Sequence, residues 1–228
     1  MCVLEASRFS GRFAVVSALF IFFQTSVAAV DFINDVMPIL SRLGCNGSSC
    51  HGKAEGQNGF KLSVFGHNPE GDYRALTKES RGRRISPAIP KDSLLLRKIA
   101  GEVGHGGGIR ITKESKAYNL LLNWIRDGMK FKILERPALL KIRLEPAMQV
   151  MKFGKQLPLK VIAEFSNGEK KDVTWLSVFH SNDTSMANVA DDGTVTIGDM
   201  VGQTSVMARY LGKVAVFQSI IPRPGTTV

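Results

Sequence analysis

A short stretch of the chain combines two thiols with an imidazole. Cys45 and Cys50 are separated by four residues, and His51 follows the second thiol directly. Paired thiols followed by histidine attach a c-type haem, usually with two residues between the thiols. Each thiol can add across a porphyrin vinyl group, and the histidine then serves as the proximal iron ligand. Because Gly47 and two serines let the longer loop bulge outward, the motif predicts one covalent haem c.

Two other chemistries use the same residues. In an exported protein, two cysteines five positions apart can close a short disulfide. A zinc ion can take both thiols together with His51 or another histidine. Adjacent Cys50 and His51 are poorly placed to reach one tetrahedral ion together, so zinc ranks last. The Cys45–Cys50 disulfide stays open as the alternative to haem.

The first 29 residues match a secretory signal. Arg8 and Arg12 precede an apolar core from Ala14 to Phe23, and Val27-Ala28-Ala29 is a small-residue cleavage site. An uncut membrane anchor is the alternative, but the apolar run is shorter than the roughly 20 residues that a span needs. We therefore expect an exported protein in the periplasm, at the cell envelope or outside the cell, where disulfides persist.

Composition narrows the choice of partners. The 228 residues allow one or two domains, and the net charge is +10. Such an excess suits nucleic acid, anionic envelope polymers or an acidic redox partner. No nucleic-acid recognition motif is present, so we expect no nucleic-acid partner. We expect electrostatic docking to a redox partner protein at or near the cell envelope, where the chain can belong to a larger envelope assembly.

The chain from residue 30 to 131 has helical patterning around the thiol motif. Asp31 is expected to cap a helix that leads into Cys45, with a bend or late start at Pro38. Residues 52–92 are loop-like, which makes sense if a porphyrin supplies part of the core. Arg81, Arg83 and Arg84 lie in this stretch, where they can pair with haem propionates, face a partner or form a solvated turn.

Two further helices are expected in this part of the chain. Ser93 is expected to cap the first and Thr112 the second, which runs to Asp127. Between them, His105 stands among four glycines, with room to approach a flat ligand.

The sixth iron ligand has several candidates. His105 lies in the open glycine loop, and Met129 follows the last helix and is a common ligand type in cytochromes c. His67 is closer to the thiol motif. An exposed loop histidine is the plain alternative for His105.

Residues 32–130 resemble the cytochrome c-like domain of large secreted planctomycete proteins. The resemblance rests on the runs Leu43–Lys53, Gly56–Leu62, Ser93–Leu96, His105–Gly108 and Leu122–Gly128. It implies His51 and His105 as proximal and distal axial ligands, with Met129 as the alternative distal ligand. Ligation by two histidines implies a lowered reduction potential.

The pattern changes to alternation after Pro137. Apolar residues alternate over 140–144 and 157–165, and further strands are expected over 171–175, 187–189, 194–197, 204–210 and 213–220. About seven strands with turns between them predict an antiparallel β-sandwich. Asp172, Asp183, Asp191 and Asp192 can be read as a calcium site, but turn chemistry explains them better.

This second module resembles a bacterial immunoglobulin-like domain of group 2. The resemblance rests on Phe165–Thr174, Ser181–Asp183, Ala187–Val195 and Gly202–Val206, and it implies a spacer or adhesive module. The expected fold class is thus an all-α cytochrome c-like domain followed by an all-β immunoglobulin-like sandwich. The expected division is a signal peptide (1–29), a haem domain (30–131), a linker (132–136), the immunoglobulin-like domain (137–222) and a tail (223–228).

The sequence therefore predicts an exported electron-transfer module that carries one covalent haem on an immunoglobulin-like spacer. The alternative is a non-redox structural or adhesive envelope protein with a Cys45–Cys50 disulfide. We expect no enzyme, because a dihaem peroxidase would need a second haem motif. In the proteins that this chain resembles, much larger domains usually follow these two modules, and any enzymatic activity can lie in those larger domains.

Overall fold

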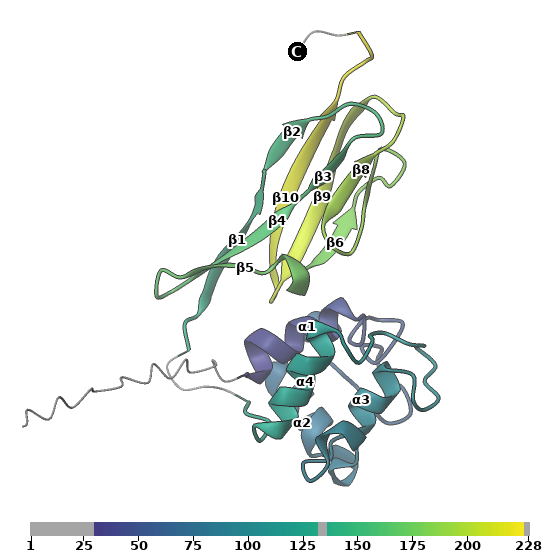
Figure 1. Cartoon of the computed structure of the whole chain (residues 1–228), viewed down its shortest axis with the longest axis vertical. Helices are drawn as coiled ribbons and strands as arrows, with labels where there is room; N and C mark the ends of the chain where they lie inside the picture. Colours follow the sequence, from purple (N-terminus) through teal and green to yellow (C-terminus); the bar gives the residue numbers. More distant parts are fainter. Residues whose placement is uncertain (1–29, 132–135, 226–228) are drawn as a thin grey trace, which may run out of the picture.

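The computed structural model describes residues 30–131 and 136–225. The helices gather at one end of the molecule and the strands form its longer part (Figure 1). The helical end contains the π-helical turn η1 (Phe32–Val36), the α-helices α1 (Met37–Arg42), α2 (Pro69–Thr77), α3 (Leu94–Ile99) and α4 (Lys116–Arg126), and the 3₁₀ turns η2 (Val64–Gly66), η3 (Glu79–Gly82) and η4 (Pro90–Asp92).

The first helical segment begins as the sequence predicts. The Asp31 side chain accepts a hydrogen bond from the Asn34 backbone N–H, which caps η1. Pro38 then lies in the first turn of α1, where its missing N–H costs no intrahelical hydrogen bond. The last turn passes directly into Cys45, whose N–H donates to the Leu40 carbonyl at 2.9 Å. The helix thus sets the position of the first thiol.

The strands form three hydrogen-bonded sheets. Their orders are β1-β4-β5, β2-β10-β9-β6 and β3-β8-β7. The strands are β1 (Leu139–Glu145), β2 (Met148–Val150), β3 (Gln156–Pro158), β4 (Lys160–Phe165), β5 (Lys170–Asp172), β6 (Val178–Ser181), β7 (Ala187–Val189), β8 (Thr194–Ile197), β9 (Gly202–Tyr210) and β10 (Lys213–Ile221), with the 3₁₀ turn η5 (Thr174–Leu176) after β5.

Pairing follows the alternation in the sequence. β9 and β10 pair antiparallel over their whole length, from Lys213 opposite Tyr210 to Ile221 opposite Gly202. The side chains of Val206, Ala208 and Phe217 face the core and are fully buried. This hairpin contains the two longest strands of the β part.

The expected fold class, an all-α cytochrome c-like domain followed by an all-β immunoglobulin-like sandwich, is wrong. Over the described residues the structure is mostly β, since ten strands form three sheets and the α-helices have only 6 to 11 residues each. Glycine-rich turns interrupt the helical end, and Gln57 and Phe60 pair there as an isolated β-bridge. The β part departs from the expectation as well, because its strands divide into three sheets.

Several element boundaries also differ from the sequence predictions. Residues 69–77 form helix α2 within the stretch expected to be a loop, where Pro69 occupies its first turn and Asn68 caps it. The cap of α4 is Ser115 rather than Thr112, because the Ser115 hydroxyl accepts from the Tyr118 N–H. Trp175 lies in η5 and not in a strand.

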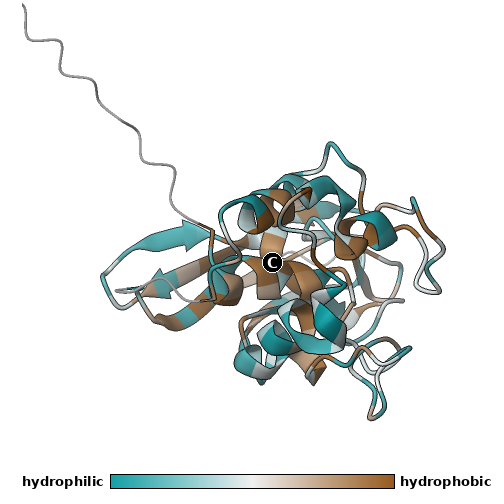
Figure 2. Ribbon diagram, turned by 90° about the horizontal axis from the view of Figure 1, so that it is seen from below, coloured by the Kyte–Doolittle hydropathy of each residue, from teal (hydrophilic) through white to brown (hydrophobic). Residues whose placement is uncertain are grey.

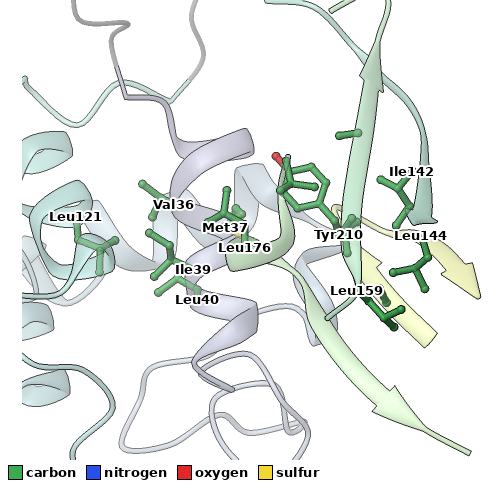
Figure 3. Close-up of a cluster of buried hydrophobic side chains, with 14 of the residues drawn as sticks. Val36, Met37, Ile39, Leu40, Leu121, Ile142, Leu144, Leu159, Leu176 and Tyr210 are labelled. Atoms are coloured by element: carbon green, nitrogen blue, oxygen red, sulfur yellow. The ribbon is translucent and has the colours of Figure 1, made fainter. Parts of the chain in front are cut away.

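One hydrophobic core continues from the helical end into the β part. Figure 3 shows Val36 and Met37 of the first helical segment beside Leu176 of η5, with Tyr210 of β9 next to them. Leu176 and Met37 are each at most 3% exposed. Seen from the helical end, the helices are striped, with hydrophobic and hydrophilic residues on different sides (Figure 2). The hydrophobic stripes supply this shared core.

Polar contacts at this junction surround Arg136. Its guanidinium forms ion pairs with Asp31, which is fully buried, and with Asp35. Burial lowers the pKa of Arg136 to about 10, so the side chain remains a cation at neutral pH. Beside it, the Tyr210 hydroxyl donates to the Asn34 carbonyl at 3.2 Å. These contacts tie the start of the helical end to β9.

Replacing Arg136 with Met should destabilise the whole chain. The change removes a cation from a buried carboxylate, which typically costs about 3 kcal/mol of unfolding free energy. Urea unfolding followed by circular dichroism measures the loss. The control is Arg74→Met, because Arg74 is an exposed residue of α2. Equal unfolding free energies for the two variants would show that the Arg136 ion pairs do not hold the junction.

Candidate functional site

A cleft of about 630 Å³ opens in the helical end. This volume lies within the range of small-molecule and cofactor pockets. Its walls come from the end of α1, the loop that follows it, α3 and the glycine-rich loop after α3. Cys45, Cys50, His51 and His105 all line it. The fold thus brings the residues singled out in the sequence to one site.

The two histidines of the cleft hold their rings almost parallel. The ring centres of His51 and His105 are 6.4 Å apart, and the ring planes differ by 9°. The Nδ1 atom of His51 lies 3.0 Å from the Phe60 carbonyl oxygen, and that of His105 lies 3.1 Å from the Gly108 carbonyl oxygen. A carbonyl only accepts, so in the neutral form of each ring Nδ1 carries the proton and Nε2 carries a lone pair.

The pKa of His51 sets the form of its ring at neutral pH. Burial lowers the pKa of His51 most strongly, and the charges of His105 and Arg84 lower it further. The imidazole is therefore neutral at neutral pH, which is the form that binds a metal.

The loop between the thiols is compact. The His51 N–H donates to the Cys45 carbonyl at 3.0 Å, and the Gly52 N–H donates to the Gly47 carbonyl at 3.0 Å. A Cβ at position 52 would lie 2.3 Å from the Asn46 carbonyl oxygen, so only glycine fits there. Of the four residues between the cysteines, Asn46 is buried and the two serines are exposed, while both thiols remain at the cleft.

The thiol of Cys45 is protonated over the physiological range. Burial raises its pKa to about 12, against a smaller opposing effect of the positive charge on Arg110. Cys45 and Cys50 are both free thiols and both half-buried. Two free thiols at one cleft suit either covalent attachment of a ligand or a disulfide.

The charged residues among those that line the cleft are cations. They are Arg83, Arg84, Lys98 and Arg110. Arg83 and Arg110 are exposed, whereas Arg84 is buried. Leu94, Leu95 and Ile99 give one wall an apolar surface. A flat apolar ligand with negative groups at its edge matches this lining.

Other residues considered in the sequence lie away from the cleft. The side chain of Met129 packs against the core, and its carbonyl accepts from the Tyr73 hydroxyl. His67 is exposed, and its Nδ1 contacts the Val64 carbonyl. Neither lines the cleft, and neither does the exposed Arg81. Of the candidate distal ligands, only His105 faces His51 across it.

Trp124 is part of a separate aromatic cluster. Its ring packs against Phe32 and Tyr73, and its Nε1 donates to the Lys130 carbonyl at 3.0 Å. Trp124 does not line the cleft, so its role is to pack the helices.

The sequence alone does not identify Phe60 as a residue of the site. Its carbonyl anchors His51, and its ring lies 4.6 Å from the His51 ring. Arg84 also packs on Phe60, with its guanidinium carbon 4.5 Å from the Phe60 ring centre. The signal in the sequence was an apolar residue in a polar, glycine-rich loop, which is too weak to assign a contact partner.

The aspartates of the β part behave as turn residues. Asp172 accepts from the Thr174 N–H, Asp183 from the Ser185 N–H and Asp192 from the Thr194 N–H. Nowhere in the described residues do three or more His, Cys, Asp or Glu side chains gather in a group that could hold a metal ion. The hydrogen bonds of Asp172, Asp183 and Asp192 are those of turn residues, as the sequence predicts.

Comparison with known proteins gives structural neighbours alone. No family model matches the chain, and no curated protein matches it. The chain is similar to domains 4 and 5 of the S-layer protein SbsC, with 18% identity over 38% of this chain and 53% of that chain, at a TM-score of 0.33. It is also similar to the SbsC fragment of residues 31–844, with 20% identity over 41% of this chain and 14% of that chain, at a TM-score of 0.34. The matched region thus spans about half of the first of these two chains and a much smaller part of the second.

These findings correct the class to which the sequence analysis assigned the chain. It expected a c-type cytochrome with a metal-binding site and an electron-transfer role. No family model and no curated protein places the chain among cytochromes, and the described residues contain no group of three or more His, Cys, Asp or Glu side chains that could hold a metal ion. The assignment to electron-transfer cytochromes is therefore wrong. Within the same described residues, no helix is long and apolar enough to cross a membrane.

The Cys45 thiol, with its raised pKa, gives a direct test of the cleft. In the folded chain without a ligand, Cys45 should react with iodoacetamide at pH 8 at least about tenfold more slowly than in urea, because so little of it is thiolate. Peptide mass spectrometry measures labelling of Cys45 over time. The matched control is a Cys50→Ser variant, which leaves a single thiol in the motif. Labelling at the same rate in both solvents would contradict the burial of Cys45.

Proposed function

We propose that this chain is an exported protein of the cell envelope whose cleft holds one haem. The observation that carries the proposal is the pair of parallel imidazoles, His51 and His105, each anchored through Nδ1 to a backbone carbonyl. A porphyrin supplies four nitrogen ligands to its iron, so the protein needs to add only two. This is why a haem site requires no cluster of three protein ligands.

The residues of the cleft fit such a group. His51 and His105 would serve as proximal and distal axial ligands, and the apolar wall of α3 would lie along the ring. The exposed Arg83 and Arg110 would meet negative groups at its edge. When bound, the haem supplies a redox-active iron whose potential the two imidazoles and the burial of the ring set.

Covalent attachment would use the two thiols. Each Sγ–H would add across one vinyl C=C bond, with the sulfur bonding to one carbon and the hydrogen going to the other. No electrons are gained or lost, so attachment needs no oxidant. The secretory pattern of residues 1–29, which lie outside the described residues, supports export to a compartment where this attachment takes place.

A second candidate is a structural or adhesive envelope protein without haem. Cys45 and Cys50 line the same cleft, which also favours a disulfide between them. Its formation removes two protons and two electrons, which a disulfide-exchange partner of the envelope accepts. Neither candidate is an enzyme. The redox partner protein and the lack of nucleic-acid binding stay predictions.

The spectrum of protein matured in a periplasm that attaches c-type haem tests the proposal. A pyridine haemochrome that survives acid–acetone extraction, at about one haem per chain, is expected from two thioether bonds. No haem in the folded chain would remove the proposal and leave the disulfide candidate.

Histidine variants then test the axial ligands. His51→Ala should abolish a stable haem spectrum, and His105→Ala should leave haem attached but change a low-spin spectrum to high-spin, because one axial ligand is lost. His67→Ala is the matched control, because His67 is an exposed histidine outside the cleft. A low-spin spectrum in His105→Ala would take the distal role away from His105.

A further inference from the structure

We propose that Arg84 is a positioning residue for the cleft: acting through Phe60, it fixes the orientation and the tautomer of His51. The inference deepens the proposed haem function and rests on it for its purpose. The contacts themselves belong to the protein alone. They form a chain from a buried guanidinium to the Phe60 ring and from the Phe60 carbonyl to His51.

Arg84 is held firmly at one end of this chain. Its side chain is buried, with the whole residue 5% exposed. One terminal nitrogen donates to the Ala75 carbonyl at 2.9 Å and to the Glu79 carbonyl at 3.1 Å. The other donates to the Gly59 carbonyl at 2.8 Å and contacts the Ser80 hydroxyl at 3.3 Å. The guanidinium thus joins α2 and η3 to the loop that carries Phe60.

This guanidinium has no carboxylate partner among the ion pairs of the described residues. Carbonyl dipoles and the face of the Phe60 ring stabilise its charge instead. A flat fork of donors can reach carbonyls of two segments while lying on a ring, and a lysine ammonium cannot do both. The geometry therefore requires arginine rather than any cation.

Phe60, held in place by Arg84, in turn restrains the His51 ring. Its peptide is fixed on one side by the Arg84 contact to the Gly59 carbonyl and on the other by the bridge to Gln57. The Phe60 carbonyl then accepts from His51 Nδ1, while the His51 carbonyl accepts from the Leu62 N–H at 2.8 Å. The imidazole is therefore held with Nε2 free to bind in the cleft.

The tautomer of His51 in the chain without haem tests this role. In ¹⁵N-labelled protein at pH 8, long-range NMR correlations of the ring distinguish the Nδ1–H from the Nε2–H form. One hydrogen bond of ordinary net strength favours the Nδ1–H form by about tenfold. Arg84→Lys should remove this preference and give comparable amounts of both forms. Arg83→Lys, at the adjacent exposed arginine of the cleft, should retain it.

A fold control separates positioning from simple destabilisation. Arg84→Lys with wild-type circular dichroism and an unchanged His51 tautomer would overturn the proposal. If Arg84→Lys does not fold, Phe60→Leu decides by the same criterion, because it removes the ring that Arg84 contacts. A retained tautomer in that variant overturns the proposal as well.

The measurement needs no haem, so its failure is distinguishable from failure of the proposed function. A changed tautomer in a chain that never binds haem would support the positioning role and reject the haem site. In haem-loaded protein, electron paramagnetic resonance reports the angle between the two axial ring planes. Arg84→Lys should broaden that signal, because His51 then adopts more than one orientation.

Discussion

The cleft depends on one hydrogen bond, between His51 Nδ1 and the Phe60 carbonyl. It decides which ring nitrogen carries the proton, and so leaves the other free to bind. His105 is anchored in the same way by Gly108, within a loop that its glycines keep open. A Cβ at Gly107 would lie 2.9 Å from the His105 ring, so a larger residue there would displace the imidazole. Two short loops thus hold two rings parallel without help from a long helix.

The helical end needs its neighbour as well as its own core. Its short helices bury little surface individually, and α1 leads straight from the junction into Cys45. Across that junction, Arg42 of α1 donates to the Ser177 carbonyl at 2.9 Å. The guanidinium of Arg209 in β9 lies 3.7 Å from the Phe65 ring centre. The continuous hydrophobic core therefore makes the β part a support for the segment that carries the thiols, in addition to any role as a spacer.

The sequence predicted local features better than the arrangement of elements. The cap at Asp31 and the strands over 204–210 and 213–220 follow from capping chemistry and alternation, and the structure confirms them. The division into three sheets was not predictable, because it depends on which strand edges meet after the core forms. Helix α2 was missed because its polar, glycine-containing sequence carries a weak helical signal.

The candidate site likewise contains some residues that the sequence identifies and others that it does not. The motif residues were identifiable because thiols beside a histidine have a specific chemistry. The role of Phe60 and the buried role of Arg84 were not predictable, since both come from contacts between segments distant in the sequence. A buried arginine without a carboxylate partner can be recognised only once its surroundings are known.

The most direct test of the account is the intact mass of the chain, matured in a periplasm that attaches c-type haem and then denatured. Two thioether bonds predict a mass increased by one haem that persists after denaturation and reduction. A mass two hydrogens below that of the reduced chain, with no haem, would contradict the account and identify a Cys45–Cys50 disulfide.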